Sequence, residues 1–85
     1  MNTFYIITFN NAHEAMQAEE ICLKEKVAVV MMPTPTYITK SCGISLKLNK
    51  EAMEEMKQLI LKDKFKYKSI VYFENGKVSE INITN

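Results

Sequence analysis

The thiol of Cys42 is the side chain of this sequence best suited to covalent chemistry. It lies near the end of a stretch that opens with Pro33-Thr34-Pro35 and closes with Ser41-Cys42-Gly43. Cysteine reacts as its thiolate, and nearby hydrogen-bond donors and a cation lower the pKa of a thiol. Four threonine and serine hydroxyls and Lys40 supply both within residues 33–43. We therefore predict that Cys42 is the catalytic residue and that it is exposed to solvent.

The residues around Cys42 are candidates for holding a ligand. Hydroxyls offer donors, the lysine offers a charge, and a proline stiffens the start of the loop. Glycine lets the backbone approach a ligand closely or adopt a positive φ. The predicted ligand-binding residues are Thr34, Pro35, Lys40, Ser41 and Gly43. The alternative is that Cys42 is only a small residue at the start of a strand, because most free cysteines behave as small hydrophobes.

Cys22 and His13 are the other side chains with reactive potential. Cys22 recurs with Ala15 and Ala18 at helical spacing, which predicts a buried, inert thiol. A redox pair of Cys22 with Cys42 is the alternative, and their spacing does not favour it. We expect His13 to be an exposed residue at a helix start, although it could act as a base near Cys42. Two cysteines with one histidine do not make a structural zinc site, so no metal or cofactor is predicted.

The composition limits the classes of partner. The 85 residues make one domain, 1–85, with eleven lysines, no arginine and a formal net charge of +1. Arginine is the usual reader of phosphates and guanine edges, so no nucleic-acid partner is expected. Lysines alternate with Phe65 and Tyr67 over residues 62–68, which could bind RNA by charge and stacking; we favour a solvated helix end there. No apolar run approaches the roughly 20 residues that span a membrane, and free thiols predict a cytoplasmic protein.

The order of the expected elements predicts the fold class. Asn11 and Asn49 are expected to cap two helices, and Asn75-Gly76 is typical of a β-hairpin turn. Strands are expected over residues 4–9, 27–32, 44–48, 70–74 and 78–83, and helices from residue 11 to about residue 26 and from residue 49 to about residue 64. This βαββαβ order with an added C-terminal strand predicts an α+β, ferredoxin-like two-layer sandwich. The first and third strands would then lie side by side in an antiparallel sheet, with both helices on one face.

The opposite face of that sheet is also expected to be apolar. The first two strands carry apolar side chains on both of their alternating faces. Because the two helices cover only one face, a second copy of the chain is the simplest cover for the other. The sequence therefore predicts a homodimer.

Pro33-Thr34-Pro35, followed after a hydroxyl-rich spacer by Ser41-Cys42-Gly43, resembles the pattern of the selenium/sulfur carrier protein-like family of small bacterial domains. The resemblance extends to the opening strand and to His13-Glu14-Ala15, and spans roughly residues 4–73. It implies a compact domain in which Cys42 carries sulfur or selenium. Members usually have Arg directly after Pro-Thr-Pro, whereas this chain has Thr36. If that Arg holds an anion, only Lys40 can replace its charge here.

Two functions from different classes are consistent with these observations. In the first, Cys42 holds sulfur or selenium and passes it between donating and accepting proteins, as a carrier rather than an independent catalyst. In the second, the loop holds a small anion at a dimer edge as a non-enzymatic regulatory module, and Cys42 is incidental. The reactivity of the Cys42 thiol distinguishes the two.

Overall fold

The computed structural model describes residues 3–34 and 43–81 as a five-stranded antiparallel sheet with two helices. The elements follow in the order β1 (Thr3–Thr8), α1 (Ala12–Lys24), β2 (Val30–Pro33), β3 (Ile44–Leu48), α2 (Lys50–Leu61), β4 (Ser69–Glu74) and β5 (Lys77–Ile81). The α+β class predicted from the sequence is confirmed.

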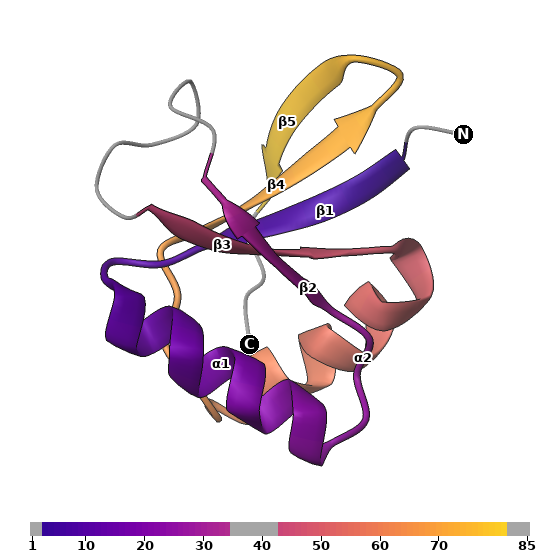
Figure 1. Ribbon diagram of the computed structural model, residues 1–85. Helices are drawn as coiled ribbons and strands as arrows, with labels where there is room; N and C mark the ends of the chain where they lie inside the picture. Colours follow the sequence, from indigo (N-terminus) through magenta and orange to yellow (C-terminus); the bar gives the residue numbers. More distant parts are fainter. Residues whose placement is uncertain (1–2, 35–42, 82–85) are drawn as a thin grey trace.

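The strands lie in the order β2-β3-β1-β4-β5, and every neighbouring pair is antiparallel. Strand β1 is central, paired with β3 on one side and β4 on the other. Both helices pack against the same face of the sheet (Figure 1). The predicted pairing of the first and third strands, with both helices on one face, is therefore confirmed.

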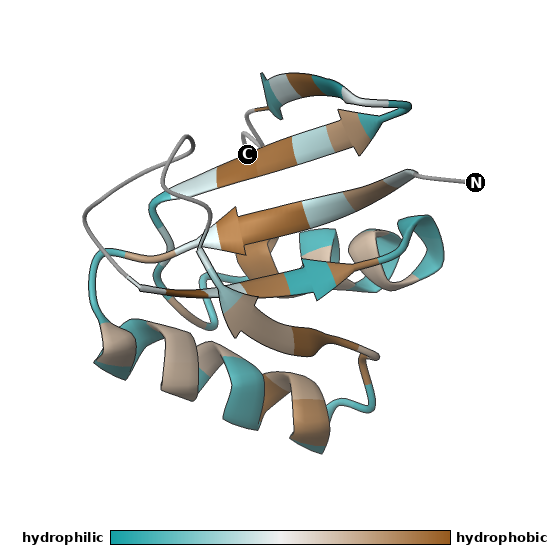
Figure 2. Ribbon diagram, turned by 45° about the horizontal axis from the view of Figure 1, so that its top comes forward, coloured by the Kyte–Doolittle hydropathy of each residue, from teal (hydrophilic) through white to brown (hydrophobic). Residues whose placement is uncertain are grey.

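The main core lies between the helices and the sheet. Its sheet side includes Ile7 and Leu46, which are fully buried, and its helix side includes Cys22, Met53 and Met56. Hydrophobic segments run along the middle of β1 and β4 (Figure 2). Alternate residues of a strand point to opposite faces, so this core takes Ile7 while Ile6 points away from the helices.

The face of the sheet away from the helices carries a second, smaller apolar cluster. Ile6, Val71 and Phe73 are buried in it, and Phe4 packs against them. The rings of Phe4 and Phe73 stack with centroids 4.9 Å apart, and the Lys47 Nζ lies 4.4 Å from the Phe4 centroid. The expected apolar second face is thus present, but its central residues are already buried within one chain. Cover by a second copy stays a prediction.

Both predicted helix caps are present. The Asn11 side chain accepts a hydrogen bond from the Glu14 N–H at 2.9 Å, and the Asn49 side chain accepts one from the Ala52 N–H at 2.8 Å. These bonds satisfy amide groups that have no partner within the helix. The Glu14 carboxylate bonds back to the Asn10 N–H at 3.0 Å, one residue before the cap.

The second strand begins later than predicted, at Val30 rather than Val27. Val27 instead closes α1: its N–H donates to the Cys22 carbonyl at 2.8 Å, after Lys26 turns the chain with a φ of 61°. This is a Schellman motif with lysine where glycine is usual. The strand also includes Pro33, which was expected to stop it. An edge strand tolerates proline because one side of its backbone needs no ladder donor.

The Asn75-Gly76 turn is formed as predicted. Both residues have positive φ, 50° and 86°, which is the backbone of a type I′ hairpin turn. It pairs Glu74 with Lys77 and places β5 at the edge of the sheet. The predicted end of this strand, residues 82–83, lies outside the described residues.

Replacing Asn49 with alanine is expected to lower the free energy of unfolding by about 1 kcal/mol, because the Ala52 N–H loses its acceptor. Asn49→Asp keeps a side-chain oxygen there and should remain close to the parent protein. Urea unfolding followed by circular dichroism measures both. Equal midpoints for the alanine and aspartate variants would contradict the role of the cap.

Candidate functional site

The two ends of the predicted reactive loop are held together where β2 and β3 meet it. Pro33 and Ile44 form the last strand pair, and the Thr34 N–H donates to the Gly43 carbonyl at 3.0 Å. The Thr34 and Ser45 hydroxyls share a hydrogen bond of 2.5 Å. We call Thr34, Gly43 and Ser45 the loop neck. Of the predicted ligand-binding residues, the structure thus brings Thr34 and Gly43 together.

The remaining predicted site residues lie outside the described part of the chain. They are Pro35, Lys40, Ser41 and Cys42, together with Thr36. Their roles stay predictions. What the structure establishes is the position of the residue that follows Cys42 in the sequence, because Gly43 is the carbonyl partner of Thr34.

A row of hydroxyl side chains crosses the sheet beside the loop neck. Thr8 and Ser45 are fully buried and are cross-strand partners, and Thr8 also pairs with Ser69. The Thr8 and Ser69 hydroxyls lie 2.5 Å apart. With Thr34, these side chains follow one another from β4 through β1 and β3 to the end of β2, on the face away from the helices.

This row can supply hydrogen-bond donors at the neck. Each hydroxyl carries one proton and two acceptor lone pairs, so the bond between Thr34 and Ser45 uses only one of the two protons of the pair. The other can be donated to a third group. Sequence reasoning missed Thr8, Ser45 and Ser69. Strand alternation could have placed each on the face away from the helices, but only the register aligns them.

The backbone conformation at position 43 does not require a glycine. In the described residues, Gly76 is the glycine with positive φ, so of the two reasons considered for a glycine at position 43, a positive φ does not apply. Apart from its chain neighbours, a Cβ built on Gly43 would meet no atom of the described residues within 4 Å. The other predicted reason, open access for a ligand next to the backbone, is consistent with this exposed position.

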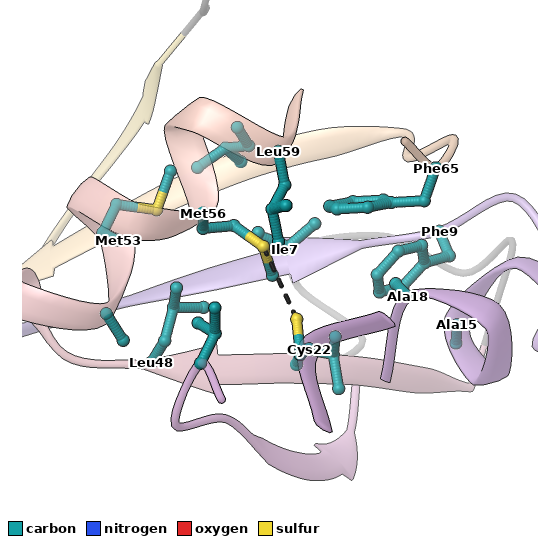
Figure 3. Packing of buried hydrophobic residues seen from close by; sticks show 14 residues of the cluster. Ile7, Phe9, Ala15, Ala18, Cys22, Leu48, Met53, Met56, Leu59 and Phe65 are labelled. Carbon is teal, nitrogen blue, oxygen red and sulfur yellow. Dashed lines mark hydrogen bonds between the residues drawn. The ribbon is translucent and has the colours of Figure 1, made fainter. Parts of the chain in front are cut away.

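Cys22 is the buried thiol that its helical position predicts. It is fully buried, and its Sγ points across the core toward the Met56 Sδ at 3.7 Å (Figure 3). Burial, and secondarily the charge of Glu19, raise the pKa of the Cys22 thiol from 9.0 to about 11. A thiol that stays protonated is a poor nucleophile. Cys22 is therefore unsuited to chalcogen transfer.

The structure shows the surroundings of two further candidates, His13 and the lysine-aromatic segment of residues 62–68. His13 is exposed on the first turn of α1, as expected, and its approach to Cys42 lies outside the described residues. Phe65 is buried in the main core, and Tyr67 is partly buried against it. These rings do not form an exposed surface on which bases could stack. The RNA-binding alternative therefore lacks its stacking contribution.

The described residues contain no group of three or more His, Cys, Asp or Glu side chains that could hold a metal ion. No helix among them is long and apolar enough to cross a membrane. A groove of about 450 Å³ lies at the other end of the β2–β3 pair, lined in part by Phe4, Val30 and Lys47. It contains none of the predicted site residues.

Comparison with protein families gives a match that covers most of the chain. The family described as Putative Se/S carrier protein-like matches residues 4–72, which include the loop, its neck and both helices. No curated protein and no solved structure matches the chain.

The two glycines are expected to differ in their tolerance of alanine. Gly76→Ala places a side chain at a φ of 86° and should lower the free energy of unfolding by about 1–2 kcal/mol. Gly43→Ala has free space and no positive φ, so its effect should stay within about 0.5 kcal/mol. Urea unfolding of the two variants makes the comparison, and a larger loss at Gly43 would show that the neck is mispositioned.

Cys22 should make stability fall at alkaline pH. Between pH 9 and about 11 the unfolded chain loses the Cys22 proton while the folded protein keeps it, so the free energy of unfolding decreases as the pH rises. The slope from this thiol is at most about 1.4 kcal/mol per pH unit. Cys22→Ala removes this contribution, and the other titrating groups cancel in the difference. Parallel pH profiles of parent and variant would contradict the buried thiol.

Proposed function

Because the chain belongs to the Putative Se/S carrier protein-like family, we propose that it carries sulfur or selenium on Cys42 and passes it between a donating and an accepting protein. The observation that carries the proposal is the family match across residues 4–72, which includes the Pro-Thr-Pro…Ser-Cys-Gly loop. The loop neck supports it, because the neck ties both ends of that loop to the sheet.

The transfer needs no oxidant. The Cys42 thiolate attacks the terminal sulfur of a persulfide donor, R–S–SH. The S–S bond of the donor breaks as a new S–S bond forms on Cys42, and the donor leaves as its thiolate. A nucleophile of the acceptor then takes the terminal sulfur and returns the Cys42 thiolate. The same steps with selenium pass through a selenenylsulfide.

The two cysteines divide into one carrier and one inert thiol. Cys22 is enclosed between α1 and α2 and its pKa is raised, so it does not compete for the cargo. Hydroxyl donors at the neck, with the pair of Thr34 and Ser45 first among them, would stabilise an anionic sulfur placed near Gly43.

Two finer assignments accompany the carrier proposal. We assign the fold to the ferredoxin-like class, supported by the β2-β3-β1-β4 order with both helices on one face and β5 as an added edge strand. We also place the protein in the cytoplasm, where thiols stay reduced.

The second candidate is a non-enzymatic module that holds a small anion as a homodimer. The observation that favours it is the partly exposed apolar material on the face away from the helices. Phe4 and Met32 are only half-buried there, and Val30 is 63% exposed on edge strand β2. In that function the neck hydroxyls bind the anion and Cys42 does no chemistry.

Brief iodoacetamide treatment near neutral pH is expected to label Cys42 and to leave Cys22 unmodified. Incubation with a small persulfide donor should then add the mass of one sulfur atom at Cys42, as read by peptide mass spectrometry. Cys22→Ala should keep this addition and Cys42→Ser should abolish it. An unreactive Cys42 in the folded protein would reject the carrier function and leave the anion-binding module as the better account.

A further inference from the structure

Four exposed lysines of residues 62–68 lie at the end of the sheet that carries the loop neck. Helix α2 begins just after β3 ends and ends where β4 begins, so residues 62–68 connect them at the neck end. The first residue of β4, Ser69, pairs with Thr8, and Thr8 pairs with the neck residue Ser45. Figure 1 shows this connection at the end of the molecule where β1 ends and β3 begins. We call Lys62, Lys64 and Lys66 the lysine ribbon.

The backbone of the ribbon is fixed at both ends and in the middle. At its start, Asp63 has a φ of 58° and the Lys64 N–H donates to the Leu59 carbonyl at 3.1 Å, which closes α2. In the middle, Phe65 is only 7% exposed and its ring lies 6.5 Å from that of Phe9. At its end, the Lys68 N–H donates to the Thr8 carbonyl at 2.8 Å.

The buried ring directs the lysines outward. Lys64 and Lys66 flank Phe65 in the sequence and, like Lys62, are exposed. One carboxylate, Asp63, lies among them, so the ribbon keeps a local excess of positive charge in a chain whose formal net charge is only +1. Helix α1 also begins at this end, four residues after β1, and a helix N-terminus carries a partial positive charge.

We propose that the lysine ribbon is a docking surface for an acidic patch on the proteins that give and take the chalcogen. This rests on the proposed carrier function. Transfer requires the partner's reactive group to come to the loop, and complementary charge at the neighbouring surface speeds the encounter and fixes its orientation. A partner that docks on the ribbon is seated at the same end of the sheet as the neck.

The same surface is poorly suited to nucleic acid. Phe65 is buried and Tyr67 is partly buried against the core, so neither offers bases a fully exposed ring on which to stack. The chain has no arginine, which removes bidentate contacts to phosphate. Lysines act as point charges, which suit a carboxylate-rich protein surface that needs no fixed geometry.

The test uses the full chain and two triple variants of equal charge. Lys62→Gln, Lys64→Gln and Lys66→Gln together remove the ribbon. Lys24→Gln, Lys50→Gln and Lys77→Gln remove three exposed lysines from the opposite end of the sheet, where α1 ends, α2 begins and the β4–β5 turn lies. Each set lowers the formal net charge by three, so a difference between them reports position rather than total charge.

A blocked ten-residue polyglutamate peptide serves as the acidic probe, titrated into ¹⁵N-labelled protein at low salt. We expect amide shifts to concentrate at residues 62–68, near Gly43 and at the start of α1. The ribbon variant should bind about tenfold more weakly, the effect of losing three exposed ion pairs, and the control variant should stay within about twofold of the parent. Binding should weaken as salt is added.

Two results would overturn the proposal. Equal weakening by both triple variants, or shifts spread over the whole surface, would show attraction to total charge alone. Tighter binding of a ten-residue thymidylate strand than of polyglutamate, with shifts at Phe65 and Tyr67, would make the ribbon a nucleic-acid surface.

Failure here can be separated from failure of the carrier function. A small persulfide donor needs no docking surface, so the ribbon variant should still gain sulfur on Cys42. If Cys42 still gains sulfur but peptide binding does not depend on the ribbon, the docking proposal is rejected and the carrier function stands. Peptide binding at the ribbon in a protein whose Cys42 gains no sulfur rejects the carrier function alone.

Discussion

Strand β1 is buried on both of its faces, and the positions of the other elements depend on this. Ile7 faces the helices with 0% exposure, and Ile6 faces away from them with 1%. A strand that is apolar on both faces must be central, so β3 and β4 pair with it on either side. A domain of this size has little surface to bury, and β1 contributes to both apolar clusters at once. The register of β1 also aligns Thr8 with Ser45 and Ser69. Because Ser45 belongs to the loop neck, this places the end of β1 next to the neck.

Local sequence signals predicted the elements that local chemistry determines. Asn11 and Asn49 cap their helices, and Asn75-Gly76 forms its turn, because each acts within three or four residues of chain. The helix ends were harder to predict, since Lys26 and Asp63 take the positive φ for which glycine is the usual signal. The late start of β2 has the same origin. Val27 reads as a strand residue but is used by the end of α1 and by the core.

The loop of the candidate site could be predicted from the sequence. The side chains that surround its two ends could not. The Pro-Thr-Pro…Ser-Cys-Gly stretch identifies the loop, and Thr34, one of its predicted ligand-binding residues, lies where β2 and β3 meet the loop. Thr8, Ser45 and Ser69 come from three strands, and only the register brings them into one row. No spacing along the chain contains that information. Of the two reasons considered for a glycine at position 43, a positive φ is not used, whereas close approach of a ligand to the backbone stays a prediction.

The fold places residues of related type in different surroundings. Cys22 lies on the helix side of the sheet, enclosed by Met56 and the core, where burial keeps its thiol protonated. Cys42 belongs to the connection between two strands, whose ends are tied by polar groups rather than by core packing. The lysine segment divides in the same way, since its aromatic residues fill the core and its lysines stay in water. In the lysine segment the apolar contacts of Phe65 and Tyr67 anchor the backbone, so the charged neighbours are held at the neck end of the sheet without being buried.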